Sequence, residues 1–268
     1  MTNKEFAKKI RVETLKMIYD SGSSHIGSAF SYIDILAVLY NKILKVDPKN
    51  TQDPIRDRFI LSKGHACSSL YATLAIKGFF PINDLVSYGK NGSNLMNHVS
   101  HKVQGVEFST GSLGHGLPFA VGKAKALKLK ETKSKIFVLI GDGELAEGSN
   151  FEAMLFASHH KLDNLILIID NNNLQSLTTV KETLNIYPID KKFEAFGWDF
   201  SNVDGHDFNA LHEVFGNFIS TLNGKPKVII AKTIKGKGIS FMENSVDWHY
   251  KSPNKKQLEE GLNQIENA

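Results

Sequence analysis

Four short, almost entirely apolar runs stand along the chain and predict strands that are buried on both faces. Longer segments with the spacing of amphipathic helices separate them. Such an alternation is typical of a parallel sheet that is covered by helices on both sides, so we expect a three-layer α/β fold. The runs are residues 59–61, 136–140, 165–169 and 228–231.

The segments between the apolar runs have apolar residues at helical spacing. Residues 6–19 place apolar side chains at Phe6, Ile10, Leu15 and Ile18, one face of a helix, and the remaining segments have a similar pattern. Residues 89–107 contain few apolar side chains and predict a long functional loop. With no repeat and no linker, the chain is expected to form one domain, 1–268. The other predicted helices are 33–44, about 65–77, about 113–130, one that begins near Gly148, and a polar helix within 252–268.

Composition narrows the class of protein. The 41% hydrophobic and 22% charged content is ordinary for a soluble globular protein. The net charge of +4 is small, and the lysines and arginines of the chain are interleaved with acidic residues. Nucleic-acid-binding proteins more often gather their basic residues on one face, so this pattern disfavours nucleic-acid binding. No apolar run approaches the roughly 18 residues of a membrane span. A single cysteine, Cys67, excludes an intrachain disulfide framework and a cysteine-based zinc site. We expect a core cysteine and a cytoplasmic protein without a signal peptide.

Asp142 and Asn172 stand just beyond two consecutive predicted strands. A strand-helix-strand unit of this length brings both strand ends to the same edge of a parallel sheet, where α/β proteins bind ligands. Carboxylate, amide and carbonyl oxygens suit Mg²⁺ or Ca²⁺ bound to phosphate. Gly-Asp-Gly alone is commonly a turn, and an asparagine run alone is commonly a loop. Their combination at two strand ends favours a metal site.

Four motifs occur in one order: residues 61–66 (LSKGHA), residues 105–114, Gly141-Asp142-Gly143 with Asn171-Asn172 about 27 residues later, and residues 232–238 (KTIKGKG). Together they resemble the signatures of transketolases, which are thiamine diphosphate enzymes. The resemblance covers nearly the whole chain, but only the N-terminal, diphosphate-binding (PP) domain of a full-length transketolase. It implies the thiamine-diphosphate-binding fold.

The resemblance also implies roles for individual residues. Asp142, Asn172 and the backbone carbonyl of Leu174 would bind the metal, expected to be Mg²⁺ with Ca²⁺ or Mn²⁺ as alternatives. Gly143 would offer its N–H to the diphosphate. The further cofactor contacts would be His65 and His249, at the diphosphate or the reacting atoms, and Gly111 and Leu113, near the aminopyrimidine.

Histidines form the second group of candidates. His25 resembles the family's N-terminal catalytic histidine, and His98, seven residues before Gly105, resembles one that binds the terminal hydroxyl of the substrate. Neutral imidazole suits proton movement on sugar hydroxyls near pH 7. An isolated histidine is more often structural, but matched positions favour catalytic roles for His25, His98 and His249. We expect structural roles for His101, His159, His160, His206 and His212.

Several positions depart from the family pattern. Ile26 replaces the usual proline after His25, Tyr250 replaces the usual glycine after His249, and His115 stands where glutamine is common. Residues 97–101 also lack the common Gly-His-Pro. These departures surround the expected substrate entrance, so they leave the sugar open. Glu147 and Glu152 match acids of an interface relay, or are simply solvated acids near a helix N-terminus.

The glutamate that activates the cofactor belongs, in transketolases, to a second, pyrimidine-binding domain. The motifs here extend to about His249, which leaves no room for that domain. We therefore expect one subunit of a split transketolase, in an α2β2 heterotetramer with a partner carrying the pyrimidine-binding and C-terminal domains. It would transfer a two-carbon ketol unit between sugar phosphates of pentose phosphate metabolism. The alternatives are a ketol-transferase for nucleotide-linked or branched sugars, and a non-catalytic relative, against which the retained site residues argue.

Overall fold

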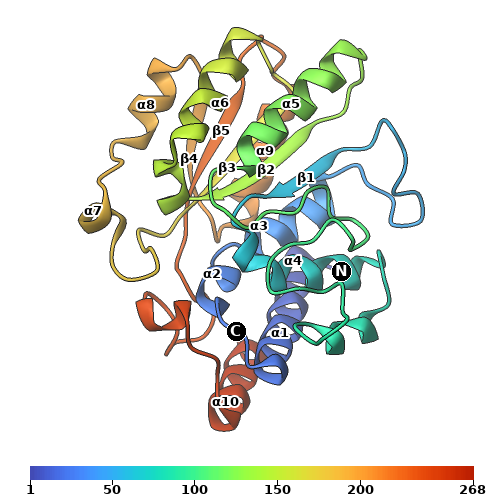
Figure 1. Cartoon of the computed structure of the whole chain (residues 1–268), viewed down its shortest axis with the longest axis vertical. Helices are drawn as coiled ribbons and strands as arrows, with labels where there is room; N and C mark the ends of the chain where they lie inside the picture. Colours follow the sequence, from blue (N-terminus) through green and yellow to red (C-terminus); the bar gives the residue numbers. More distant parts are fainter.

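A five-stranded, all-parallel sheet forms the centre of the computed structural model, which describes residues 1–268 (Figure 1). Four of the strands coincide with the four apolar runs, so the predicted three-layer α/β fold is confirmed. In sheet order the strands are β1 (Arg58–Leu61), β2 (Ile136–Gly141), β3 (Leu165–Asn171), β5 (Lys227–Lys232) and β4 (Asp199–Asp204).

Alternate side chains of each strand point to opposite faces of the sheet, and each face has its own hydrophobic core. In β2, Phe137 and Leu139 belong to one core, while Ile136, Val138 and Ile140 belong to the other. All five are fully buried. Because both faces exclude water, these strands read as continuous apolar runs rather than as alternating ones.

The helices divide between these two cores. Those at one face are α1 (Asn3–Ser21), α2 (Ile26–Ser31), α3 (Ile33–Val38) with the π-helix η1 (Leu39–Ile43), α4 (Cys67–Lys77), α9 (Phe208–Ser220) and α10 (Lys255–Glu266). Those at the other face are α5 (Gly116–Leu129), α6 (Gly148–His159) and α8 (Ile189–Ala195). Shorter elements are the 3₁₀ helices η2 (Gly64–Ala66), η3 (Ile82–Ser87), η4 (Gly143–Ala146) and η5 (Val246–His249), and the one-turn helix α7 (Val180–Thr183).

Two main elements lie outside the predicted set. Strand β4 is an edge strand whose sequence, Asp-Phe-Ser-Asn-Val-Asp, has four polar residues among its six because much of it stays in contact with solvent. Helix α9 buries Leu211, Val214 and Phe215 at helical spacing. The predicted helix over 33–44 is interrupted by Leu39, where α3 passes into the π-helix. The segment 89–107 contains neither a helix nor a strand, as expected for a long loop.

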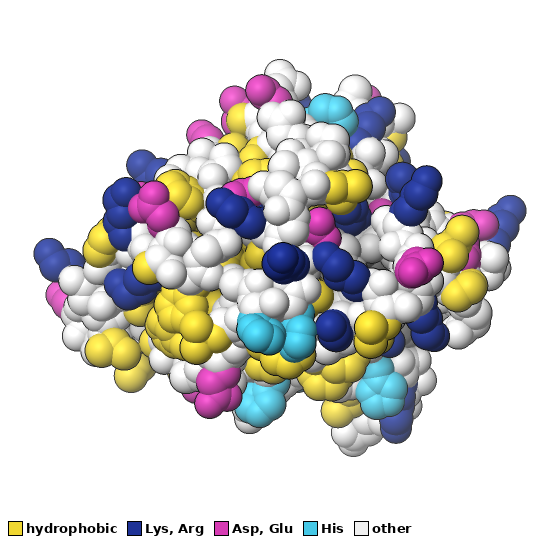
Figure 2. Space-filling model, turned by 90° about the horizontal axis from the view of Figure 1, so that it is seen from above, with side chains coloured by type: hydrophobic (Ala, Val, Ile, Leu, Met, Phe, Trp, Pro, Cys, Tyr) yellow, Lys and Arg dark blue, Asp and Glu magenta, His cyan; other side chains and the backbone are white.

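Three surface and core features bear on the expectations from composition. None of the helices combines the length and the apolar character that crossing a bilayer requires. Figure 2 shows lysines and arginines spread over the visible face with acidic side chains among them, rather than gathered in one basic patch. Cys67 is buried in the core, as predicted.

Candidate functional site

The carboxyl ends of β2 and β3 lie side by side, with Gly141 paired to Asp170. Asp142 follows β2 directly and is the N-cap residue of η4, and Asn172 follows β3 directly. One carboxylate oxygen of Asp142 accepts a hydrogen bond from the backbone N–H of Asn173 at 2.6 Å. The strand-helix-strand unit therefore brings the two halves of the predicted metal site together at one edge of the sheet.

A single cavity of about 310 Å³ opens at this edge, and all ten predicted site residues line it. That volume is near the lower limit of the roughly 300–1,000 Å³ of small-molecule sites. Residues from segments far apart in the sequence meet here. The predicted residues are His25, His65, His98, Gly111, Leu113, Asp142, Gly143, Asn172, Leu174 and His249.

The chemistry of Asp142 suits a bound cation. Its side chain is buried, and burial together with the neighbouring Asp170 raises the pKa of Asp142 to about 7. A divalent ion would favour the ionised form in this setting. Asn172 presents an amide oxygen that accepts one hydrogen bond, from Leu174 N at 3.0 Å, and keeps a second lone pair. A carboxylate, an amide oxygen and the backbone carbonyl of Leu174 form a mixed oxygen set, which fits a hard ion such as Mg²⁺.

Gly143 lies where a side chain would not fit without movement. A Cβ at this position would come within 2.8 Å of the side chain of Gln175. Its N–H, which the resemblance assigns to the diphosphate, donates to Asp142 Oδ1 at 2.8 Å in the structure. The diphosphate contact of Gly143 therefore stays a prediction that requires this bond to be shared or exchanged.

Two lysines in the cavity carry positive charge that the sequence interpretation left without a role. Lys63 donates to Asp170 at 2.5 Å in an ion pair that is almost wholly buried. Lys235 donates to the carbonyl of Gln175 at 2.7 Å, and burial with the nearby Lys63 lowers the pKa of Lys235 to about 8. Lys63 lies in the motif 61–66 and Lys235 in the motif 232–238, so these motifs were the sequence signal that could have identified both lysines. Lys63 is paired with a carboxylate, whereas Lys235 contacts only neutral groups, so Lys235 suits an anionic ligand such as a diphosphate.

The four candidate histidines form one cluster. The ring centroids of His25 and His65 are 5.0 Å apart, those of His25 and His249 are 5.1 Å apart, and those of His25 and His98 are 6.1 Å apart. His25 has φ of +73° at the start of α2, a left-handed conformation that is uncommon outside glycine. The cluster is therefore assembled from α2, η2, the long loop and η5.

Burial keeps three of these imidazoles, those of His25, His65 and His249, neutral. It lowers the pKa of His25 to about 4, with further effects from His98 and Lys235. Burial and Lys235 lower the pKa of His249 to about 3, and burial and Lys63 hold the pKa of His65 well below its usual value. Lys235 Nζ, a donor only, lies 3.0 Å from His249 Nδ1, so this nitrogen accepts and the ring proton is on Nε2.

Glu144 is a further site residue that the sequence interpretation missed. Its buried carboxylate accepts hydrogen bonds from Ser62 Oγ at 2.5 Å, Gly114 N at 2.9 Å and Gly141 N at 3.2 Å. Burial raises the pKa of Glu144. The carboxylate thereby ties the ends of β1 and β2 to the loop that carries Gly111.

The positions that depart from the family pattern lie at the rim or outside the cavity. Tyr250 lines the cavity and is 56% exposed, and its ring centroid is 4.8 Å from that of His249. His115 is exposed, and its Nδ1 donates to the carbonyl of Leu113 at 3.0 Å. Glu147 and Glu152 are both exposed at the start of α6, which leaves both interpretations of them open.

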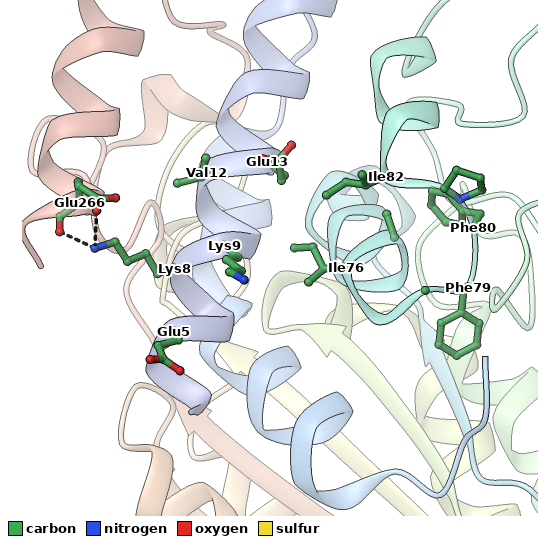
Figure 3. A pocket seen from close by; sticks show the side chains of 13 residues that line it. Glu5, Lys8, Lys9, Val12, Glu13, Ile76, Phe79, Phe80, Ile82 and Glu266 are labelled. Carbon is green, nitrogen blue, oxygen red and sulfur yellow. Dashed lines mark hydrogen bonds and ion pairs between the residues drawn. The ribbon is translucent and has the colours of Figure 1, made fainter. Parts of the chain in front are cut away.

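A larger groove of about 1,080 Å³ lies elsewhere, between α1 and the segment that follows α4 (Figure 3). It contains none of the predicted residues. Apolar side chains such as Phe79 and Ile82 line it, together with lysines and glutamates of α1. Lys8, at its edge, pairs with Glu266 at 3.3 Å. The groove lacks a convergent set of buried polar groups, so the smaller cavity is the candidate site.

Comparison with protein families matches residues 2–261 to the model described as "Transketolase, thiamine diphosphate binding domain". A protein of Actinobacillus succinogenes, named as one of the subunits of an apulose-4-phosphate transketolase, is 44% identical over 266 residues, which are 97% of this chain and 96% of that protein. "6-deoxy-6-sulfo-D-fructose transketolase subunit SqwG" of a Clostridium species is 39% identical, over 91% of this chain and 88% of that one.

Longer relatives align over part of their length. Human "Transketolase" is 38% identical over 98% of this chain but only 42% of its own. The crystal structure of transketolase from Campylobacter jejuni superimposes with a TM-score of 0.92 and 33% identity, covering 99% of this chain and 43% of that one. This chain thus spans less than half of the solved transketolase.

Proposed function

This chain belongs to the family of transketolase thiamine diphosphate binding domains, and we propose from that premise that it is the N-terminal subunit of a two-subunit transketolase. It would transfer a two-carbon ketol unit from a ketose phosphate to an aldose phosphate. In this transfer the C2–C3 bond of the donor breaks, and a new bond forms to the carbonyl carbon of the acceptor. The observation that carries the proposal is the single cavity that all ten predicted site residues line.

The need for a partner is supported by the relatives of similar length. The proteins from Actinobacillus succinogenes and the Clostridium species are each named as one subunit of a transketolase. These two relatives are similar in length to this chain, which aligns with 96% and 88% of them. We propose a partner that carries the pyrimidine-binding and C-terminal domains, and an α2β2 assembly in the cytoplasm.

The residues at the sheet edge fit the phosphate end of thiamine diphosphate. Asp142, Asn172 and the carbonyl of Leu174 would hold Mg²⁺, and Lys235 would offset part of the charge of the diphosphate. When bound, the cofactor supplies the carbanion chemistry of ketol transfer. This chain's task is to fix the phosphate end and to present histidines to the sugar.

His25, His98 and His249 would handle the hydroxyl protons of donor and acceptor. They are neutral acceptors where burial has lowered their pKa, as for His25 and His249. A bound diphosphate would stabilise imidazolium and bring these groups closer to the pH of the reaction. With its ring proton on Nε2, His249 can also donate to a substrate oxygen.

A specialised ketol-transferase is the second candidate. Two relatives are named for apulose 4-phosphate and for 6-deoxy-6-sulfo-D-fructose, and the rim of this cavity carries the unusual Tyr250. An aromatic side chain at the rim would alter which sugar fits. Nucleotide-linked and branched sugars therefore belong in any substrate screen beside the pentose phosphates.

Reconstitution tests the proposal. We expect the purified chain, with thiamine diphosphate and Mg²⁺, to show no ketol transfer from xylulose 5-phosphate to ribose 5-phosphate until the product of the neighbouring gene is added. Apulose 4-phosphate and 6-deoxy-6-sulfo-D-fructose would be assayed as alternative donors in the same complex. Full activity of this chain alone would overturn the two-subunit proposal, and activity only with an alternative donor would favour the specialised enzyme.

A further inference from the structure

Arg11, Asp34 and His206 form a hydrogen-bonded network on the far side of the segment that carries Lys235. Arg11 donates to both carboxylate oxygens of Asp34, at 2.9 Å and 2.7 Å. His206 Nδ1 lies 2.8 Å from Asp34 Oδ2. Asp34 is 4% exposed, and none of the three residues lines the candidate cavity. Helix α1, helix α3 and the loop after β4 are thereby joined at one buried carboxylate.

Contacts with the backbone fix the tautomer of His206. The N–H of Ile234 donates to His206 Nε2 at 2.9 Å, so this nitrogen carries no proton. The ring proton is therefore on Nδ1, where it is donated to Asp34. A ring that accepts on one side and donates on the other transmits the position of Asp34 to the backbone of residue 234.

Arg11 holds the same segment at a second point. Its Nε donates to the carbonyl of Lys237 at 3.1 Å. The adjacent Gly238 has φ of +100°, and a Cβ there would come within 2.9 Å of Arg11 Nε. Residues 234 and 237 are thus fastened by one network on either side of Lys235.

Lys235 reaches in the opposite direction, into the candidate cavity. It is 1% exposed, and its ammonium group bonds to Gln175 and His249 there. Gln175 directly follows the proposed metal ligand Leu174. A shift of the segment 234–237 would therefore move a cation that contacts both the histidine cluster and the metal loop.

We propose that His206, with Asp34 and Arg11 behind it, is a positioning residue that places Lys235 in the cofactor site. Its role was expected to be structural from the sequence, and it does not line the candidate cavity. The expected effect of His206 on turnover rests on the proposed function, whereas its effect on the position of Lys235 does not. An imidazole that accepts from Ile234 N–H is the required feature, so a side chain that keeps an acceptor there should largely replace it.

Chemical labelling of the whole chain tests the placement directly. Acetic anhydride labelling at pH 7, read by mass spectrometry, gives the reactivity of Lys235 relative to the exposed Lys256. We expect His206→Ala to raise this ratio severalfold, and His206→Gln, whose amide oxygen can accept from Ile234, to stay near wild type. His212→Ala, on the exposed face of α9, is the matched control.

Turnover of the reconstituted complex gives the second measurement. The loss of one positioning hydrogen bond predicts a fall of about tenfold in kcat for His206→Ala, with His206→Gln within about threefold of wild type. Equal labelling and equal kcat in wild type, His206→Ala and His206→Gln would overturn the proposal. Equal losses in both variants would also overturn it, since Gln keeps the acceptor.

Two further results separate the possible failures. If His206→Ala does not fold, long-range ¹H–¹⁵N correlation spectra of the wild-type chain decide: a proton on His206 Nε2 would contradict the network. If the wild-type complex shows no ketol transfer, the proposed function fails. The labelling ratio of Lys235 still supports or overturns the positioning role in that case.

Discussion

Asp142 Oδ2 accepts a hydrogen bond from the backbone N–H of Asn173 at 2.6 Å, across 31 positions of sequence. The bond joins the turn after β2 to the turn after β3. It fixes the carboxylate beside Asn172, on the loop that also carries Leu174. The protein's own backbone therefore helps to fix the geometry of the proposed metal site, which lowers the cost of ordering the ligands when an ion binds.

Replacing Asp142 with Ala should abolish Mg²⁺-dependent binding of thiamine diphosphate by the complex, with a loss of affinity of at least about 100-fold. The chain should still fold. The substitution removes a carboxyl group whose ionised form burial disfavours, and this offsets the loss of its two backbone hydrogen bonds. Calorimetric titration of the complex measures the affinity, and circular dichroism checks the fold. Asp84→Ala, on the surface, should bind normally; unchanged binding by Asp142→Ala would exclude this metal site.

His25→Asn should lower kcat of the reconstituted complex by roughly 10²–10⁴-fold, the range expected on loss of a proton-transfer group. Asparagine is the suitable replacement because His25 has a positive φ, which asparagine tolerates better than alanine. The thermal midpoint should therefore change little. Steady-state kinetics of the variant against His159→Asn, an exposed histidine of α6, provide the comparison. A wild-type kcat in His25→Asn would remove His25 from the reaction.

Gly64→Ala should destabilise the chain by roughly 1–3 kcal/mol and weaken cofactor binding. A Cβ on Gly64 would stand 2.2 Å from the backbone oxygen of Thr110, so the loop with Gly111 must move. Urea unfolding measures the free energy. Gly122→Ala is the matched control because its Cβ meets nothing within 4 Å on helix α5, where alanine should stabilise by about 0.5–1 kcal/mol. Equal stability of the two variants would contradict the close contact.

The parts of the fold that were predictable are those whose burial is uniform. Strands β2 and β3 exclude water on both faces, so their sequences are unbroken apolar runs. Strand β4 pairs on one side only, with β5, and its mixed sequence carries no such signal. Its partner in the sheet is set by tertiary packing, which no local pattern reveals.

The residues of the candidate site also fall into two groups, those that the sequence predicted and those that it did not. Asp142 and Asn172 could be predicted because each follows a recognisable strand, and the topology alone brings strand ends together. Lys63, Lys235 and Glu144 act through long or buried side chains whose partners lie up to 107 residues away. Such partnerships depend on the packed structure. For the same reason His206 gave no sign of its contact with Ile234.

Asp34→Asn should remove the part of the free energy of unfolding that wild type loses when the pH falls into the acid range. Burial alone would raise the pKa of Asp34, but Arg11 and His206 together bring it to about 2, from an ordinary 3.8. Because the folded value is the lower one, the stabilisation is fully present above pH 3.8 and is lost as the pH falls toward 2. The difference of 1.8 pKa units (3.8 − 2) corresponds to about 2 kcal/mol.

The variant should also be less stable at pH 7, by roughly 3–5 kcal/mol, because Arg11 would remain buried beside a neutral amide. Urea unfolding at pH 7, 4.5 and 3 measures both effects. From pH 4.5 to 3, wild type should lose more stability than Asp34→Asn, since only the wild type takes up a proton at position 34 on unfolding. The exposed Asp84→Asn should lose as much as wild type. Identical pH dependence of wild type and Asp34→Asn would mean that Arg11 and His206 do not hold this carboxylate in its ionised form.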